Sequence, residues 1–207
     1  MKQVHITYHG HACFTLESDG FRTVLDPYAH GMVPGLPDLD LQADAVLCSH
    51  AHDDHSFVQA VWLSGTDAAP PYTVSEFVVP HDDARGTKRG MNTVRIFDFG
   101  GLRVAHLGDI GVYPQEPLLK ALRCVDCLLI PIGGYYTIDA STAKQIVDAV
   151  NPRVCIPMHY RTDTTGFDTI SHLDAFTGLF PAVRFRENTL DLTPDTPIQI
   201  LVLQYKP

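Results

Sequence analysis

Seven consecutive residues constrain what this 207-residue chain can fold into more than any other segment. They are Ser49-His50-Ala51-His52-Asp53-Asp54-His55, between an apolar run at 45–48 and a second apolar run at 57–63. A strand that ends in clustered imidazoles and carboxylates is poorly suited to building a core and well suited to building a metal site. We therefore predict a strand at 45–48, a helix at 56–63 and a metal site in the turn between them.

The spacing within this turn indicates that it can serve two metal ions. His50 and His52 are two residues apart beyond a strand end, so both side chains can point the same way. Asp54 and His55 follow where the chain turns. Imidazole suits Zn, Fe, Ni and Cu, and a carboxylate extends the choice toward Mn and Fe. Three histidines and a carboxylate at ligand spacing rarely meet by accident, which favours a metal site over a solvated turn.

Composition excludes several classes of function. The formal net charge is −9, and 45% of residues are hydrophobic, as in an ordinary soluble globular protein. An acidic chain is a poor candidate for nonspecific binding to nucleic acid or to a membrane surface. Residues 1–6 lack the apolar core of a signal peptide, and no run is long enough to span a bilayer. The odd number of cysteines, five, indicates a reducing compartment without a disulfide framework, so we expect a cytoplasmic protein.

The remaining sequence predicts alternating strands and helices without a linker, and hence a single domain over residues 1–207. Further strands are predicted at 4–7, 13–17, 21–25, 72–79, 93–97, 102–107, 125–132, 154–158 and 198–205, and further helices at 116–122, 141–150 and 173–180. Residues 30–42 form a Pro- and Gly-rich loop whose apolar side chains could cover a pocket or serve a homo-oligomer interface.

Four more potential ligands or supporting residues each follow a predicted strand. Asp26 ends the strand at 21–25, His81 follows the strand at 72–79, Asp109 follows the strand at 102–107, and His159 follows the strand at 154–158. Taken with residues 50–55, their order along the chain resembles that of the metallo-β-lactamase-fold hydrolases, over most of the chain from Tyr8 to Tyr160. Four phrases resemble more narrowly the small metal-dependent hydrolases related to L-ascorbate-6-phosphate lactonases; they are Tyr8-His9-Gly10-His11, His106-Leu107-Gly108-Asp109, Pro131-Ile132-Gly133-Gly134 and Pro157-Met158-His159-Tyr160.

This resemblance implies a fold, a ligand set and a reaction. The fold would be of the α/β class (α+β by some schemes), a four-layer αββα sandwich with the site at one edge. The implied ligands are His50, His52 and His81 for one metal, Asp54, His55 and His159 for the second, and Asp109 bridging both. The cofactors would be two divalent ions, with zinc first and manganese or iron as alternatives. A hydroxide held between them would cleave a small ester, lactone or phosphate-bearing metabolite, with Asp54 and Asp109 as catalytic residues.

His106 competes with His81 for the third place on the first metal. His106 lies three residues before Asp109 on an apolar strand, so strand alternation turns it to the other face. We therefore favour His81 and expect His106 to act as a hydrogen-bond partner behind the ligands. His11 could act in the same way, and an ordinary histidine in a turn explains it almost as well. Asp26 is expected to accept a hydrogen bond from a ligand imidazole rather than to bind metal itself.

Other residues are candidates for substrate contacts. Arg85, Lys88 and Arg89 place three cations just after His81, where they could clamp a phosphate or carboxylate; a solvated loop explains them equally well. Tyr136 follows a glycine pair and could line the pocket. Tyr160 could donate a hydrogen bond to a developing oxyanion.

Three rival functions remain open at this point. An RNase or phosphodiesterase of the same fold would need a positive groove, and only residues 85–89 offer one. A di-iron redox protein would need a flavin domain or partner. A metal-binding regulator without turnover is disfavoured by the intact ligand set. The sequence does not specify the substrate, because one metal centre on this fold can serve many reactions.

Overall fold

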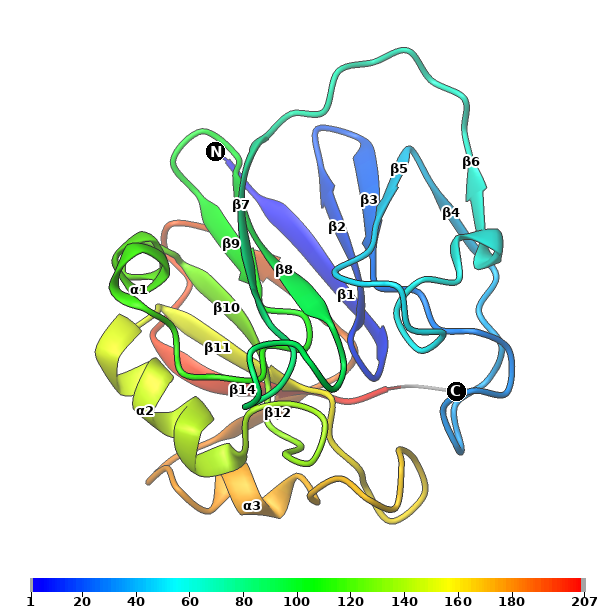
Figure 1. The fold of residues 1–207 in the computed structure, drawn as a ribbon. Coiled ribbons are helices and arrows are strands. Elements are labelled where there is room, and N and C mark those ends of the chain that lie inside the picture. The colour runs from blue at the N-terminus through cyan, green and yellow to red at the C-terminus, as the bar shows by residue number, and fades with distance from the viewer. Residues whose placement is uncertain (1, 206–207) are drawn as a thin grey trace.

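Two β-sheets packed face to face form the centre of the protein. The computed structural model describes residues 2–205, and its layers are visible in Figure 1. Helices α1 (Glu116–Leu122), α2 (Ala140–Val150) and α3 (Asp174–Thr177) lie outside one sheet, and the short pair of strands β4 (Leu41–Ala43) and β6 (Val61–Leu63) lies outside the other. The predicted α/β sandwich is thus confirmed, with helices in one outer layer and a short strand pair in the other.

The first sheet has five strands and is mostly antiparallel. Its order is β13 (Thr189–Leu192), β1 (Val4–Gly10), β2 (Cys13–Ser18), β3 (Phe21–Leu25) and β5 (Ala45–Leu47). The strands β3 and β5 are parallel, whereas the other neighbours are antiparallel. Alternate residues of β1 are buried, as expected of a sheet with one face in the core.

The second sheet has seven strands. Its order is β12 (Arg184–Arg186), β14 (Gln199–Leu203), β11 (Val154–Met158), β10 (Cys127–Pro131), β9 (Arg103–His106), β8 (Met91–Asp98) and β7 (Thr73–Pro80). The strands from β12 to β9 run parallel, and β7 to β9 form an antiparallel meander. Every residue of β10 and β11 is buried, because helices cover one face and the first sheet covers the other.

Strand alternation divides the core between these layers. Along β10, Leu129 packs between the two sheets, while Leu128 and Ile130 pack under the helices. Helix α2 begins at its cap residue Asp139, whose Oδ1 accepts a hydrogen bond from the Thr142 N–H at 2.7 Å, and it buries one apolar face. Fully burying a large aliphatic side chain contributes about 1.5–3 kcal/mol, so these faces supply much of the stability.

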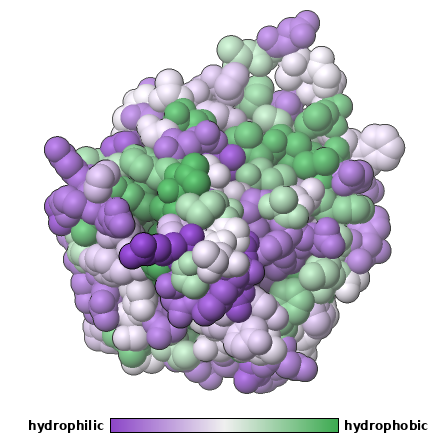
Figure 2. Space-filling model, viewed as in Figure 1, coloured by the Kyte–Doolittle hydropathy of each residue, from purple (hydrophilic) through white to green (hydrophobic). Residues whose placement is uncertain are grey.

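The predicted helix at 56–63 is wrong. Residues Val58–Ala60 form a single 3₁₀ turn, and Val61–Leu63 form β6, which pairs in parallel with β4 at the end of the predicted 30–42 loop. Two of these residues, Val58 and Val61, are β-branched and suit extended backbone, and pairing with a distant segment overrides the local helical spacing. Trp62 and Leu63 stay exposed, and Figure 2 shows hydrophobic side chains gathered over β5 and the β4–β6 pair.

Besides β4 and β6, two further strands escaped prediction, and one helix is shorter than predicted. The strands β12 and β13 have three and four residues, too few to establish a period, and β13 is fixed by pairing with β1. The helix predicted at 173–180 is the single turn α3, Asp174–Thr177, with Gly178 directly after it. None of the helices within residues 2–205 is long and apolar enough to cross a membrane.

The direction of the strands determines where the connecting loops meet. The strands β1, β3 and β5 run the same way through the first sheet, so their carboxyl ends share one edge. In the second sheet, β7, β9, β10 and β11 run the same way and share one edge too. The loops after these strands meet at one end of the sandwich, where the site described below lies.

Candidate metal centre

Histidines and carboxylates from five separate segments converge at this end of the sandwich. His11 lies in the turn between β1 and β2, residues 50–55 follow β5, His81 follows β7, Asp109 follows β9, and His159 follows β11. One group consists of His50, His52 and His81, and one ring nitrogen from each lies within 4.8 Å of the others. A second group consists of His11, Asp54, His55 and His159, again with one potential ligand atom from each within 4.8 Å.

Asp109 lies between the two groups. Its Oδ2 is 3.5 Å from His81 Nε2 of the first group and 3.2 Å from His159 Nε2 of the second. Its Oδ1 is 3.3 Å from His55 Nε2. The carboxylate is 2% exposed. One buried carboxylate is therefore within reach of both groups.

Asp26 and Ser49 orient one imidazole of each group. The Asp26 carboxylate accepts hydrogen bonds from the Ser49 N–H at 2.6 Å, from Ser49 Oγ at 2.5 Å and from His55 Nδ1 at 2.7 Å. Because the Ser49 hydroxyl proton is used by Asp26, Ser49 Oγ must accept from His50 Nδ1, which lies 2.9 Å away. Both rings then carry a proton on Nδ1, so that Nε2 of each is the potential ligand atom.

Unusual backbone geometry brings these side chains inward. Asp26, His11 and His159 have φ values of 47°, 54° and 53°, in the left-handed region that non-glycine residues seldom adopt. Gly108 has a φ of 51°, and a Cβ there would lie 2.2 Å from Asn92 Oδ1 and 2.5 Å from Ser49 Cβ. A side chain at position 108 would thus displace the residues that support the site.

Asn92 holds the backbone that carries Asp109. Its Oδ1 accepts a hydrogen bond from the Asp109 N–H at 2.9 Å, and its Nδ2 donates to the Leu107 carbonyl at 2.9 Å. Asn92 is fully buried. The sequence analysis missed both Asn92 and Ser49: Asn92 has no motif around it, whereas Ser49 could have been found as the first residue of the histidine-rich turn.

The electrostatics of the centre favour an ionised Asp109 and the neutral forms of His50 and His11. Burial and the nearby His55 lower the pKa of His50 to about 3, and burial with the neighbouring His159 lowers that of His11 to about 4. Burial opposes ionisation of Asp109, but the nearby His159 and His55 outweigh it and hold its pKa well below the usual range. His55 is the exception, since Asp109 and Asp26 outweigh its burial and raise its pKa.

The donor set fits divalent metal ions. Within residues 2–205, the buried atoms His50 Nε2, His55 Nε2, His159 Nε2 and Asp109 Oδ1 have no hydrogen-bond partner, although buried polar atoms are normally paired. Imidazole with carboxylate is a donor set suited to zinc, iron and manganese. Cations bound by the two groups would satisfy these atoms and compensate the buried charge of Asp109.

His106 is placed differently from these residues. Its ring lies between the sheets, where Nε2 donates to the Ala12 carbonyl at 3.0 Å and Nδ1 accepts from the Gly108 N–H at 3.2 Å. Both ring nitrogens are therefore occupied by backbone groups, one next to His11 and one next to Asp109. His106 belongs to neither donor group, whereas His81 belongs to the first.

A cavity of about 400 Å³ opens onto the metal centre. It is lined by Met32, His52, Asp53, Asp54, His81, Arg89, Asp109, Tyr136 and Phe167. Arg89 and Tyr136, both singled out from the sequence, thus reach the site. Phe167 had no signal in the sequence, since it lies between predicted elements and reaches the cavity only through the fold.

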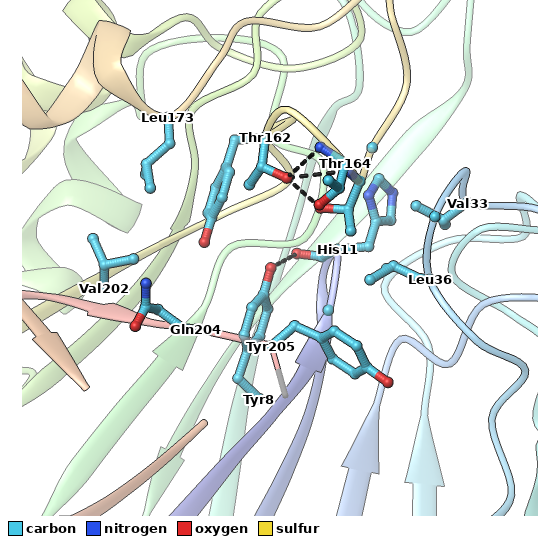
Figure 3. A pocket seen from close by; sticks show the side chains of 15 residues that line it. Tyr8, His11, Val33, Leu36, Thr162, Thr164, Leu173, Val202, Gln204 and Tyr205 are labelled. Atoms are coloured by element: carbon cyan, nitrogen blue, oxygen red, sulfur yellow. Dashed lines mark hydrogen bonds between the residues drawn. The ribbon is translucent and has the colours of Figure 1, made fainter. Parts of the chain in front are cut away.

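Three candidates for substrate contacts lie elsewhere. Tyr160 lines a separate cavity of about 320 Å³. Two other residues of that cavity, Tyr8 and Gln204, are labelled in Figure 3. Arg85 lines a third cavity beside α1. Lys88 is exposed and its Nζ lies 2.7 Å from Asp83 Oδ1. None of these three lines the cavity at the metal centre, and a substrate contact by any of them stays a prediction.

Known proteins share this fold. The profile of the beta-lactamase superfamily domain matches residues 5–159. The protein is thus a metal-dependent hydrolase of the metallo-β-lactamase superfamily. A UPF0173 metal-dependent hydrolase of Carboxydothermus hydrogenoformans is 30% identical over 192 residues, which cover 76% of this chain and 84% of the relative. The chain belongs to this UPF0173 family.

Solved structures agree with that assignment. A Thermotoga maritima protein, named as a Zn-dependent hydrolase of the same superfamily, is 32% identical, with a TM-score of 0.73 over 97% of this chain and 98% of that one. A metallo hydrolase of the archaeon Ignicoccus hospitalis is 22% identical, with a TM-score of 0.66 over 92% of this chain and 99% of that one. The second similarity concerns the fold alone.

Proposed function

We propose that the protein hydrolyses a small ester, lactone or phosphate-bearing metabolite at a centre of two divalent cations, with zinc as the first candidate. The observation that carries this proposal is Asp109, a buried carboxylate within 3.5 Å of a histidine in each of two donor groups. Such cations supply activation of water to hydroxide near neutral pH and polarisation of the scissile group. The zinc in the name of the Thermotoga maritima relative supports the choice of metal.

Each donor group would hold one cation. His50, His52 and His81 form the first set of ligands, and Asp54, His55 and His159 form the second, while Asp109 serves both. His11 lies beside the second set, and its Nε2 is 3.1 Å from Asp54 Oδ2. In our proposal His11 is a hydrogen-bond donor that orients the Asp54 carboxylate.

Asp54 is the candidate proton acceptor of the reaction. Its side chain is 14% exposed and lines the cavity, so it can meet both the centre and an entering substrate. The hydrogen bond from His11 and the charge of His55 overcome the effect of burial and lower its pKa, so the carboxylate is ionised at neutral pH. An ionised carboxylate next to the site can take a proton from the attacking water.

The cavity argues for a small substrate. A volume of about 400 Å³ suits a metabolite, and cavities of that size commonly bind small molecules. The phrases that resemble the L-ascorbate-6-phosphate lactonases favour a lactone or a phosphate ester within this range. Nucleic acid is disfavoured, because Arg89 is the one cation among the residues lining this cavity.

The proposal is tested by metal analysis and by activity. Elemental analysis should find about two metals per chain, and a panel of lactones, phosphodiesters and thioesters should identify the bond that is cleaved. Asp109→Asn should lower turnover about 1,000-fold or more, since several kcal/mol of transition-state stabilisation would be lost. Asp195→Asn, a matched change at an exposed position, should leave turnover unchanged. Activity that persists in Asp109→Asn would refute the proposed role of this carboxylate.

A further inference from the structure

We propose that Arg89 binds an anionic group of the substrate, a carboxylate or a phosphate, while the scissile bond lies at the metal centre. This inference rests on the proposed hydrolytic function and names the class of substrate: an ester, lactone or phosphate ester that carries a second, acidic group. It follows from how the structure separates three cations that are adjacent in the sequence.

The three cations of the 81–90 loop have different surroundings. Lys88 is exposed and paired with Asp83 at 2.7 Å, and Arg85 is exposed beside a different cavity. Arg89 is half-buried and lines the cavity that contains His52, Asp54 and Asp109. Of the three, Arg89 alone is in a position to meet a molecule bound at the metal centre.

Arg89 lies against two aromatic rings. Its guanidinium carbon is 5.3 Å from the centre of the Tyr136 ring and 5.6 Å from that of Tyr135. The Tyr136 ring is in turn 6.1 Å from Phe167 and 6.5 Å from the ligand candidate His159. The aromatic contacts fix the guanidinium without using its N–H groups, which remain free for the two parallel hydrogen bonds that a carboxylate or phosphate accepts.

The loop that carries Arg89 is organised in advance by Asp82. This buried carboxylate accepts hydrogen bonds from four backbone N–H groups, those of Ala84, Gly86, Lys88 and Arg89, at 2.8–3.0 Å. The backbone of Arg89 is therefore fixed next to His81, and little conformational entropy is lost when the side chain binds a ligand. Figure 2 shows hydrophilic side chains where this part of the chain reaches the surface.

The charges of the cavity leave Arg89 without an internal partner. None of the ion pairs found within residues 2–205 involves Arg89, although the cavity has three carboxylates. Asp54 and Asp109 face the imidazoles of the metal centre, and Asp53 is exposed. A cation held on aromatic rings, facing a centre that would itself be positive when loaded, favours a substrate with two anionic or polarisable ends.

Binding of small acids to the metal-loaded protein tests the inference without assuming which bond is cleaved. Benzoate offers one anionic group, isophthalate and terephthalate offer two at different spacings, and 3-phosphonobenzoate replaces one carboxylate with a phosphonate. Calorimetric titration of the wild-type protein should show that at least one two-acid ligand binds about tenfold or more tightly than benzoate, as expected for one charge-assisted contact. The more favourable of carboxylate and phosphonate identifies the natural group.

Two variants with the same change of charge in the same loop complete the test. Arg89→Gln should abolish the advantage of the two-acid ligands while binding benzoate as the wild type does, and Lys88→Gln should keep that advantage. The inference is overturned if the wild type shows no advantage, if Arg89→Gln retains it, or if Arg89→Gln weakens benzoate equally, which would indicate a purely structural role. Elemental analysis and benzoate binding report on the metal centre itself, so failure of the proposed function is recognised separately.

Discussion

Replacing Asp26 with asparagine should damage both halves of the metal centre by one substitution. Asp26 contacts His55 directly and His50 through Ser49, so it fixes the tautomer of one imidazole in each donor group. Asparagine keeps the size of the side chain and tolerates the left-handed backbone, with φ of 47°, better than most residues. The substitution therefore isolates the loss of one acceptor oxygen.

The expected magnitude follows from the hydrogen bonds of that oxygen. Asp26 Oδ2 accepts from Ser49 Oγ at 2.5 Å and from His55 Nδ1 at 2.7 Å, and the side chain is 1% exposed. In Asp26→Asn, an amide N–H₂ that can only donate would face two donors, Ser49 Oγ and His55 Nδ1. His55 could relieve this conflict only by moving its proton to Nε2, and the proton would then block the nitrogen that faces the metal centre. Hydrogen bonds to a charged group contribute about 1.5–3 kcal/mol each, and partial rearrangement should leave a loss of about 2–4 kcal/mol in the free energy of unfolding. Metal affinity should fall about 10- to 100-fold.

Two measurements check this prediction. Urea denaturation of the chelated protein reports the free energy of unfolding, and competition against a chelator reports the affinity of each cation. The control is Asp19→Asn, the same substitution at an exposed residue whose φ is 51°, and it should change stability by about 0.5 kcal/mol or less. If Asp26→Asn binds both cations as tightly as the wild type, Asp26 does not set the tautomers and the reasoning is refuted.

Two further predictions concern histidines. His81→Ala should reduce bound metal to about one per chain or less, because it removes a member of the first donor group. His106→Ala should keep the metal and lower the free energy of unfolding, because both ring nitrogens of His106 bond to backbone groups. The reverse pattern, measured by elemental analysis, would contradict the choice of His81. Burial lowers the pKa of His9 to about 4, so the unfolded chain, with a histidine pKa of about 6.5, binds a proton first as the pH falls. In chelated protein the free energy of unfolding should therefore drop by up to about 3 kcal/mol between pH ~6.5 and ~4 on account of His9. His9→Gln should remove that part of the decrease, and identical pH profiles of the two proteins by urea denaturation would rule the effect out.

Helices and strands were predicted correctly from the sequence where local hydrophobic spacing alone determines the element. Helix α1 has the bounds expected from the sequence, α2 differs by one residue, and the strands of the buried sheet centre follow continuous apolar runs. Potential ligands were found because metal donors are few in kind and stand directly after predicted strands. The structure brings six of the seven predicted ligands into two neighbouring groups and places the seventh, Asp109, between them; their binding of metal stays a prediction.

The sequence failed where contacts between distant segments decide the outcome. Residues 58–63 have helical spacing but are held as a turn and a strand by pairing with Leu41–Ala43. The role of Ser49 arises from hydrogen bonds to Asp26, 23 positions away, and that of Asn92 from hydrogen bonds to Leu107 and Asp109, 15 and 17 positions away. No periodicity carries information about such contacts.

By itself, then, the sequence determined which potential metal donors stand directly after predicted strands, because strand alternation and ligand chemistry are local properties. Its class of fold was indicated by the resemblance of these motifs to a known family. Only the tertiary structure decided which groups face the cavity. The fold places His81 in the first donor group, whereas both ring nitrogens of His106 bond to backbone groups. Of three neighbouring cations, it places Arg89 at the cavity of the metal centre, and it places Tyr160 at another cavity. The physical reason is that the direction of a side chain in a loop depends on the backbone hydrogen bonds and packing that the rest of the chain imposes on it.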